Sequence, residues 1–118
     1  MKLAIVGSRD LDGNALAWQA IEDALDRHKP DLLISGGADG IDKMAEESAK
    51  ARGTPTCIFY PEGKTWPAFR ARNILIAEGC SHLVRIYSDT TSTYGSGFTA
   101  DWAKMLGKYV ELIKIETR

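Results

Sequence analysis

The chain has 118 residues, of which 44% are hydrophobic and 26% are charged. This composition is typical of a soluble globular protein and excludes a disordered tail, and the length fits one domain over residues 1–118. Fifteen basic and sixteen acidic residues give a formal net charge of −1, so nucleic acid would have to be held by a local basic patch rather than by a global field.

The first third of the chain reads as two strands with a helix between them. Leu3 to Val6 is an apolar run typical of a strand buried on both faces, and it is too short for the core of a signal peptide. From Asn14 to His28, apolar residues recur on one helical stripe. Leu32 to Ser35 is a second buried strand. No apolar run approaches the length of a membrane span.

The middle of the chain repeats this alternation. Asp39 is a plausible N-cap for a second helix that ends at Gly53. Thr56 to Tyr60 is a third strand, and the proline before it suits the edge of a sheet. A third helix is expected over Pro67 to Glu78, with Thr65 as its cap.

The last third contains two further strands and one helix. His82 to Tyr87 is a fourth strand, and a polar loop follows from Ser88 to Ser96. A fourth helix is expected from about Phe98 to Leu106, because Gly107 stops the pattern. Tyr109 to Ile115 is a fifth strand, whose two charged residues indicate an exposed edge.

Strict alternation of strands and helices predicts an α/β fold with a five-stranded parallel sheet and right-handed crossovers. With the third and fifth strands at the edges, the sheet order is 3-2-1-4-5, a three-layer, doubly wound, Rossmann-like arrangement. Ligands of such folds bind outside the carboxyl ends of the strands, where the strand order reverses. The loops placed there are Gly7 to Asp10 and Ser88 to Gly97, with Gly36 to Gly40 beside them.

The loop Gly36-Gly37-Ala38-Asp39-Gly40 lies between a buried strand and a helix N-terminus. Unpaired N–H groups and the helix dipole attract an anion to such a place, and glycines let the backbone approach a phosphate. The alternative is a tight turn that binds nothing. Asp42 can either bond the N–H groups of its own loop or accept a hydrogen bond from a ligand hydroxyl. Neither a P-loop nor a G-x-G-x-x-G spacing is present, so a nicotinamide cofactor is not expected.

Further polar residues are expected at the same crevice. Arg9 follows the first strand and suits recognition of a phosphate or carboxylate, unless it is a surface arginine paired with Asp10 or Asp12. Asn73 sits on an apolar helix face, so it should be buried and hydrogen-bonded, either for ligand binding or as the anchor of a loop. The candidate ligand site comprises Gly7, Ser8, Arg9, Gly36, Gly37, Ala38, Gly40, Asp42, Arg72, Asn73, Ser96, Gly97 and Thr99.

The remaining conspicuous side chains have structural interpretations. The two histidines have no partner spacing typical of a metal or a catalytic dyad, so we expect structural roles and no metal site. The two cysteines form neither a zinc spacing nor a disulfide framework, which favours a cytoplasmic, reduced protein. The three tryptophans are expected in the core or at a subunit contact. Alternatively, Trp66 and Phe69 stack bases beside Lys64, Arg70 and Arg72.

Four segments in order carry a resemblance to a known superfamily: "AIVGSRD", "ISGGADGIDKMAEESAKARG", "FRARNILIAEG" and "GSGFTADWAKMLGK". They resemble the core of the SLOG superfamily of Rossmann-like domains. The size and the G-S-R opening are similar to the short branch related to YspA and YpsA, and the loops are similar to those of the DNA-processing protein A (DprA) branch. The resemblance implies that Arg72 and Asn73 belong to a ligand pocket, and that the protein is a homo-oligomer.

Three functions follow from the residues and the resemblance. The first is binding of a nucleotide or nucleotide-derived phosphorylated ligand, as a sensor or binding protein, without a further cofactor. The second is hydrolysis of the N-glycosidic bond of a nucleoside monophosphate, as in the LOG branch. That branch carries P-G-G-x-G-T-x-x-E, whereas this chain has Trp102 in place of the glutamate, so Asp42, Asp89 or Asp101 would have to supply the carboxylate. The third, less favoured because of the acidic balance, is binding of single-stranded DNA.

Overall fold

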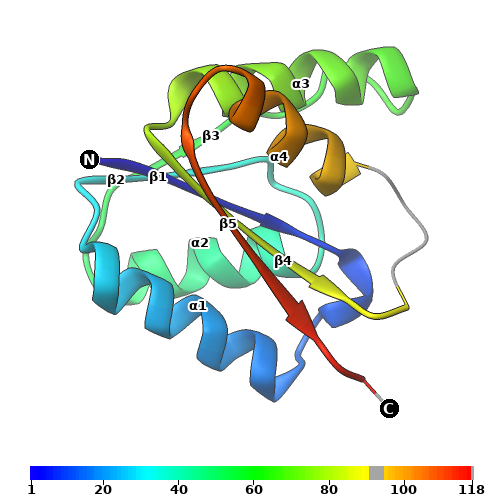
Figure 1. Ribbon diagram of the computed structural model, residues 1–118. Helices are drawn as coiled ribbons and strands as arrows, with labels where there is room; N and C mark the ends of the chain where they lie inside the picture. The colour runs from blue at the N-terminus through cyan, green and yellow to red at the C-terminus, as the bar shows by residue number, and fades with distance from the viewer. Residues whose placement is uncertain (91–94, 118) are drawn as a thin grey trace.

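The computed structural model describes residues 1–90 and 95–117, which form a parallel sheet between two layers of helices (Figure 1). The strands are β1 (Lys2–Gly7), β2 (Leu32–Ser35), β3 (Thr56–Ile58), β4 (His82–Ser88) and β5 (Tyr109–Ile115). The helices are α1 (Ala15–His28), α2 (Ile41–Ala51), α3 (Trp66–Gly79) and α4 (Gly95–Met105), with a short 3₁₀ turn, η1 (Arg9–Leu11), after β1. Among these helices none has the length and apolar character needed to cross a membrane.

The sheet order is β3-β2-β1-β4-β5, and every neighbouring pair is parallel. Ala4 in β1 pairs with Ile34 in β2 on one side and with Leu83 in β4 on the other. The predicted fold class and strand order are therefore confirmed. The order reverses between β1 and β4, and in doubly wound folds ligands bind outside the carboxyl ends of the strands at such a point.

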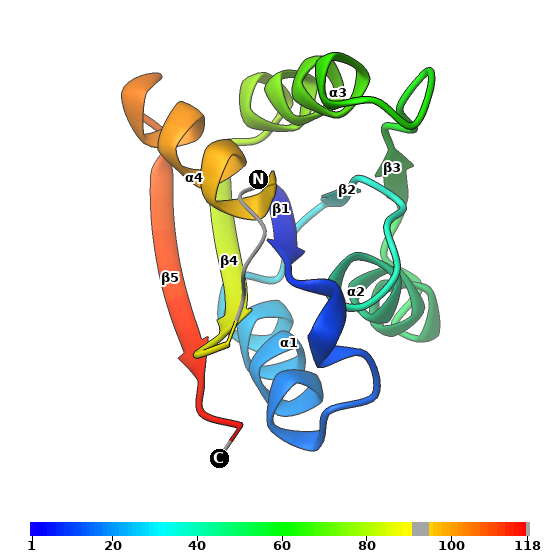
Figure 2. The ribbon, with the colours of Figure 1, turned by 90° about the vertical axis from the view of Figure 1, so that its right-hand side faces the viewer.

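The two faces of β1 supply the centres of two separate cores. Leu3 and Ile5 pack with α1 and α2, whereas Ala4 and Val6 pack with α3 and α4. Figure 2 shows the two helix pairs on opposite faces of the sheet. Because β1 has no solvent-exposed face, its sequence is a continuous apolar run rather than an alternating pattern.

Several element boundaries differ from the sequence-based predictions. Helix α4 begins at Gly95 instead of Phe98, and β3 ends at Ile58 instead of Tyr60. Strand β3 stops where its partner β2 stops, since Phe59 N–H donates the last bond to the Ser35 carbonyl at 2.9 Å. The 3₁₀ turn η1 was not predicted. Residues 91–94 of the predicted polar loop lie outside the described residues.

Two predicted caps also differ. Gly40, not Asp39, occupies the N-cap position of α2, so the Asp39 prediction was wrong. The Asp39 carboxylate instead pairs with Lys43 at 3.3 Å. Thr65 is the N-cap residue of α3, as predicted, but its side chain makes no capping hydrogen bond to the described residues.

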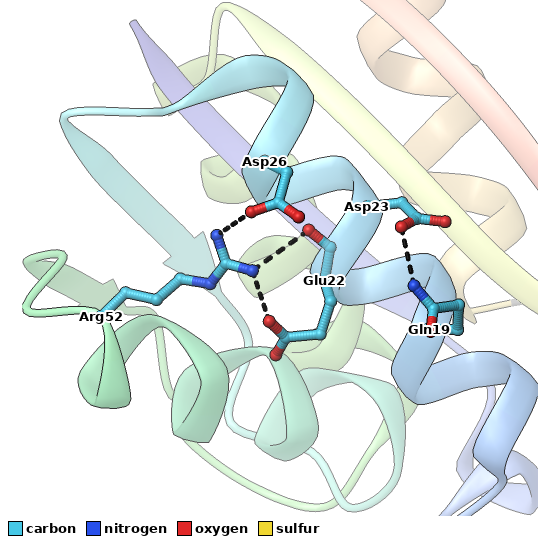
Figure 3. Close-up of polar contacts among 5 residues, drawn as sticks. All are labelled: Gln19, Glu22, Asp23, Asp26 and Arg52. Atoms are coloured by element: carbon cyan, nitrogen blue, oxygen red, sulfur yellow. Dashed lines mark hydrogen bonds and ion pairs between the residues drawn. The ribbon is translucent and has the colours of Figure 1, made fainter.

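Arg52, at the carboxyl end of α2, fastens this helix to α1 (Figure 3). Its guanidinium donates to the Asp26 carboxylate at 2.6 Å, to the Glu22 carboxylate, and to the Glu22 carbonyl at 3.3 Å. The hydrogen bond from Arg52 lowers the pKa of the Glu22 carboxyl. Gln19 and Asp23 also lie on α1, but they do not contact Arg52 in this way. The Gln19 side-chain amide donates a hydrogen bond to the Asp23 carboxylate at 2.8 Å.

Replacing Arg52 by methionine is expected to destabilise the protein by about 1 kcal/mol at neutral pH, because exposed ion pairs in a small network contribute that much at most. A carboxyl group whose pKa is lower in the folded state stabilises the protein at any pH above its unfolded-state pKa. This stabilisation is lost as the pH falls through its folded-state pKa. The difference between the variant and the wild type should therefore shrink below about pH 4. Urea unfolding across pH measures it. Lys50→Met, which removes an exposed charge from α2, is the control. An equal loss of stability in Lys50→Met would refute the role of the ion pairs of Arg52 with Glu22 and Asp26.

Candidate functional site

A cavity of about 870 Å³ opens at the carboxyl end of β1. It lies among the residues that lead into α2, one side of α3 and the first turn of α4, which is the position where ligands bind in doubly wound folds. The cavity is lined by Val6, Gly7, Arg9, Ala38, Asp42, Trp66, Phe69, Arg70, Arg72, Asn73, Ile76, Gly95, Ser96, Phe98 and Thr99.

Three arginines, Arg9, Arg70 and Arg72, line this cavity. None of them takes part in the ion pairs found within residues 1–90 and 95–117, so the expected alternative pairing of Arg9 with Asp10 or Asp12 does not occur there. In a chain whose net charge is −1, three arginines that form no ion pair within the described residues make a local positive site in one cavity. Such a site attracts an anion.

Arg72 is held at the centre of the cavity by a chain of hydrogen bonds. Its Nη1 donates to the carbonyl of Gly36, and its Nε donates to Oδ1 of Asn73 at 2.8 Å. The Asn73 Nδ2 in turn donates to the carbonyl of Gly95 at 3.3 Å. Asn73 is thus buried and hydrogen-bonded, as its place on an apolar helix face predicts. Arg72 Nη2 makes no hydrogen bond within the described chain, so it remains available to a ligand.

Among the described residues that line the cavity, Asp42 is the one that is acidic. It is buried, and its Oδ2 accepts a hydrogen bond from the backbone N–H of Ala38 at 3.3 Å. Burial raises the pKa of the Asp42 carboxyl to about 7, although the positive charge of Arg72 acts in the opposite direction. Asp42 therefore changes its protonation state near neutral pH.

The glycines of the loop before α2 are required by the protein's own atoms. Gly40 has a φ of +86°, and a Cβ at this position would lie 2.7 Å from both the Arg9 Cα and the Ser8 carbonyl oxygen. A Cβ on Gly36 would lie 2.8 Å from Arg72 Nη1 and 2.9 Å from Asp42 Oδ2. The absence of side chains here lets two loops and a buried arginine pack together.

The first turn of α4 uses most of its polar groups internally. The Thr99 hydroxyl donates to the Gly95 carbonyl at 3.0 Å, and the Ser96 hydroxyl accepts from Arg85 Nε at 2.9 Å. Asn73 also bonds the Gly95 carbonyl. These contacts explain why α4 starts at Gly95 despite two glycines in its first turn. The Ser96 hydroxyl makes no other hydrogen bond to the described residues, and Ser96 lines the cavity.

Of the thirteen candidate residues, eight line the cavity: Gly7, Arg9, Ala38, Asp42, Arg72, Asn73, Ser96 and Thr99. The other five, Ser8, Gly36, Gly37, Gly40 and Gly97, do not line it. Ser8 instead ties two loops together, since its buried hydroxyl accepts a hydrogen bond from Ser88 N–H at 3.3 Å. Gly97 is buried in the first turn of α4.

Comparison with models of protein families shows to which family the chain belongs. A family model described as "YAcAr: YspA, cpYpsA-related SLOG family" matches residues 1–66. This chain belongs to that SLOG family. The matched segment carries β1, β2 and the glycine loop, and extends to the first residue of α3. A search of curated proteins found no match.

Among solved structures, the SLOG domain is similar to the X-ray structure of DNA processing protein A (DprA) from Streptococcus pneumoniae. The two share 22% sequence identity with a TM-score of 0.77. The alignment covers 94% of this chain and 49% of that chain. At this identity the likeness concerns the fold, and the SLOG domain spans about half the length of the DprA chain.

The sequence-based site omitted several lining residues of the SLOG domain. Val6 and Ile76 belong to the core, and their contact with the cavity follows from packing alone. Trp66, Phe69 and Arg70 were considered only as an alternative, and Phe98 was not considered. The signal for Phe98 was available, since Phe98 and Trp102 are four residues apart and stack at 5.6 Å on one face of α4.

The two histidines of the SLOG domain lie outside the residues that line the cavity. The His28 and His82 ring centroids are 5.6 Å apart, and each is within 6.1 Å of the Tyr109 ring. Across the described ranges no group of three or more His, Cys, Asp or Glu side chains could hold a metal ion.

Substituting Gly40 by alanine is expected to destabilise the SLOG domain by about 3 kcal/mol or more, because a Cβ would meet backbone atoms that cannot shift cheaply and the φ is unfavourable. Gly53→Ala is the matched control. Gly53 has a φ of +73°, and no heavy atom lies within 4 Å of the place that its Cβ would occupy, so only the backbone penalty of about 1 kcal/mol applies there. Chemical denaturation of both variants checks the difference, and equal losses would contradict the close-packing argument.

Proposed function

We propose that the SLOG domain binds a nucleotide or nucleotide-derived phosphorylated ligand in the cavity at the carboxyl end of β1, between the loop before α2, one side of α3 and the first turn of α4. The observation that carries this proposal is the convergence of Arg9, Arg70 and Arg72 on one cavity, where none of them forms an ion pair with another described residue. The family membership and the DprA-like fold support a nucleotide-related role. The cavity volume falls within the range of about 300–1,000 Å³ that is typical of small-molecule sites.

The phosphate is assigned to the part of the cavity shared by Arg9 and Arg72. Burial lowers the pKa of the Arg72 guanidinium, and the positive charge of Arg9 lowers it further, while Asp42 raises it. Two guanidinium groups that disfavour each other's charge gain from an anion placed between them. The N-terminus of α2 adds its dipole at Ala38 and Asp42, in the same part of the cavity.

Arg9→Gln is expected to weaken binding of nucleoside monophosphates about 10- to 100-fold, since a charge-assisted hydrogen bond contributes roughly 1.5–3 kcal/mol. Its guanidinium makes no hydrogen bond or ion pair with residues 1–90 or 95–117, so the melting temperature without ligand should be unchanged. Thermal-shift and calorimetric titrations against mono-, di-, cyclic and dinucleotides measure the effect, because ligand at 100 times its dissociation constant adds about 2.7 kcal/mol.

Lys50→Gln, which removes an exposed charge on α2 away from the cavity, is the control and should bind normally. Silence of the wild type across the whole panel would refute the proposal. Binding that Arg9→Gln leaves intact would refute the placement of the phosphate.

Affinity for the phosphorylated ligand is expected to fall as the pH rises from 6.5 to 8.5. The Asp42 carboxyl has a pKa of about 7, so it is neutral below this value and carries a negative charge above it, which repels the phosphate. The phosphate loses its own second proton near pH 6 and stays doubly charged over most of this range. Calorimetry across pH tests the trend, and Asp42→Asn should remove it. A pH dependence that survives in Asp42→Asn would contradict the role of this carboxyl.

Asp42 also favours a second candidate function, hydrolysis of a nucleotide N-glycosidic bond. Of the three carboxylates considered for this reaction, Asp42 lines the cavity, whereas Asp89 and Asp101 do not. A carboxyl group that titrates near neutral pH can protonate a leaving base or, when ionised, stabilise positive charge on the sugar. Incubation with nucleoside monophosphates should then release free base, and Asp42→Asn should abolish release while still binding ligand. No release from any of them would end this candidate.

Binding of single-stranded DNA remains the third and least favoured function. The net charge of −1 offers no broad basic surface. Arg9, Arg70 and Arg72 line one cavity rather than a groove that could follow a DNA strand.

A further inference from the structure

One end of the cavity is built from aromatic side chains and an arginine. Trp66 is the first residue of α3, and its ring meets the Phe98 ring of α4 edge to face, with centroids 5.5 Å apart. The Arg70 guanidinium carbon lies 5.4 Å from the centre of the Phe98 ring and 5.4 Å from that of Trp102. Trp66, Arg70 and Phe98 all line the cavity.

The two hydrophobic cores do not account for the position of Trp66. Trp102 packs against the core between the sheet and α3 and α4, but Trp66 belongs to neither core. Trp66 is 44% exposed although a tryptophan gains much from burial. The Trp66 ring therefore lines the cavity with much of its surface exposed, and its contact with the Phe98 ring holds it there.

We propose that Trp66, Phe98 and Arg70 form a subsite for a planar aromatic base. This inference rests on the proposed function and makes it narrower: the ligand is a nucleotide that carries its base, not a sugar phosphate or inorganic phosphate. Bases stack on aromatic rings and on guanidinium planes, and this end of the cavity offers both. The phosphate lies toward Arg9 and Arg72, and the base lies toward the start of α3.

The order of elements along the cavity supports this orientation. Arg72 and Asn73 lie on α3 one to two turns beyond Trp66, so the phosphate and base ends are joined along one side of a single helix. Two turns of helix span about 11 Å, which suits a ribose between a phosphate and a base. The subsite uses residues of α3 and α4, whereas the family model covers this chain only to Trp66.

The test compares adenosine monophosphate with ribose 5-phosphate, which has the same phosphate and sugar but no base. The wild type is expected to bind adenosine monophosphate at least about 5-fold more tightly, because stacking of one base contributes roughly 1–3 kcal/mol. Trp66→Leu should lose about 5- to 100-fold in affinity for adenosine monophosphate and leave ribose 5-phosphate unchanged, while Trp66→Phe should retain most of the binding. Calorimetry and quenching of tryptophan fluorescence give independent readouts.

Tyr60→Leu is the matched control, since Tyr60 is an aromatic residue with 69% exposure that does not line the cavity. Circular dichroism and the urea midpoint establish that each variant is folded. Equal affinities for the two ligands, or an equal loss for both in Trp66→Leu, would overturn the base subsite and leave the proposed phosphate site standing. Failure of the wild type to bind either ligand or any other nucleotide would instead overturn the proposed function itself.

Discussion

The hydrogen bonds of Arg72 join the parts of the molecule that surround the cavity. This side chain leaves α3, reaches the Gly36 carbonyl at the end of β2, and through Asn73 reaches the Gly95 carbonyl at the start of α4. A buried arginine is costly unless its donors are used, and here the Gly36 carbonyl and the Asn73 side chain accept from two of the guanidinium nitrogens. The same bonds fix the width of the cavity, because they set the distance between the loop before α2 and the first turn of α4.

The arginines on the outer surface of the α1 layer form ion pairs, whereas those that line the cavity do not form them with other described residues. Arg52 and Arg27 are paired with carboxylates on the outside of the α1 layer, whereas Arg9, Arg70 and Arg72 have no such pairing in the part of the chain that the structure describes. Asp42 lines the same cavity, and its pKa of about 7 lets it become neutral. The positive charge of the cavity is therefore adjustable, and it is largest when Asp42 holds a proton.

The sequence predicted the fold well because β1, β2 and β4 are buried on both faces and so appear as apolar runs between amphipathic helices. It also identified Asn73, since a polar residue on an apolar stripe needs buried partners. The start of α4 was missed because it depends on tertiary bonds to the Gly95 carbonyl, which outweigh the poor helix propensity of glycine. Phe98 and Arg70 meet only because α3 packs beside α4, and no spacing within either helix predicts that contact.

The glycine loop lies beside the cavity for a reason that differs from the one its sequence suggested. Glycines between a strand and a helix suggested that a phosphate approaches the backbone, yet the atoms closest to a Cβ at Gly36 or Gly40 would belong to Arg72, Asp42 and the loop after β1. The lack of side chains at these glycines lets the arginine and the carboxyl group come together at the edge of the sheet. In the proposed function, ligand recognition depends on side chains from α3 and η1, which are far from the loop in sequence. A glycine motif of this kind therefore marks where the cavity forms, and in the proposed function the charged and aromatic residues around it select the ligand.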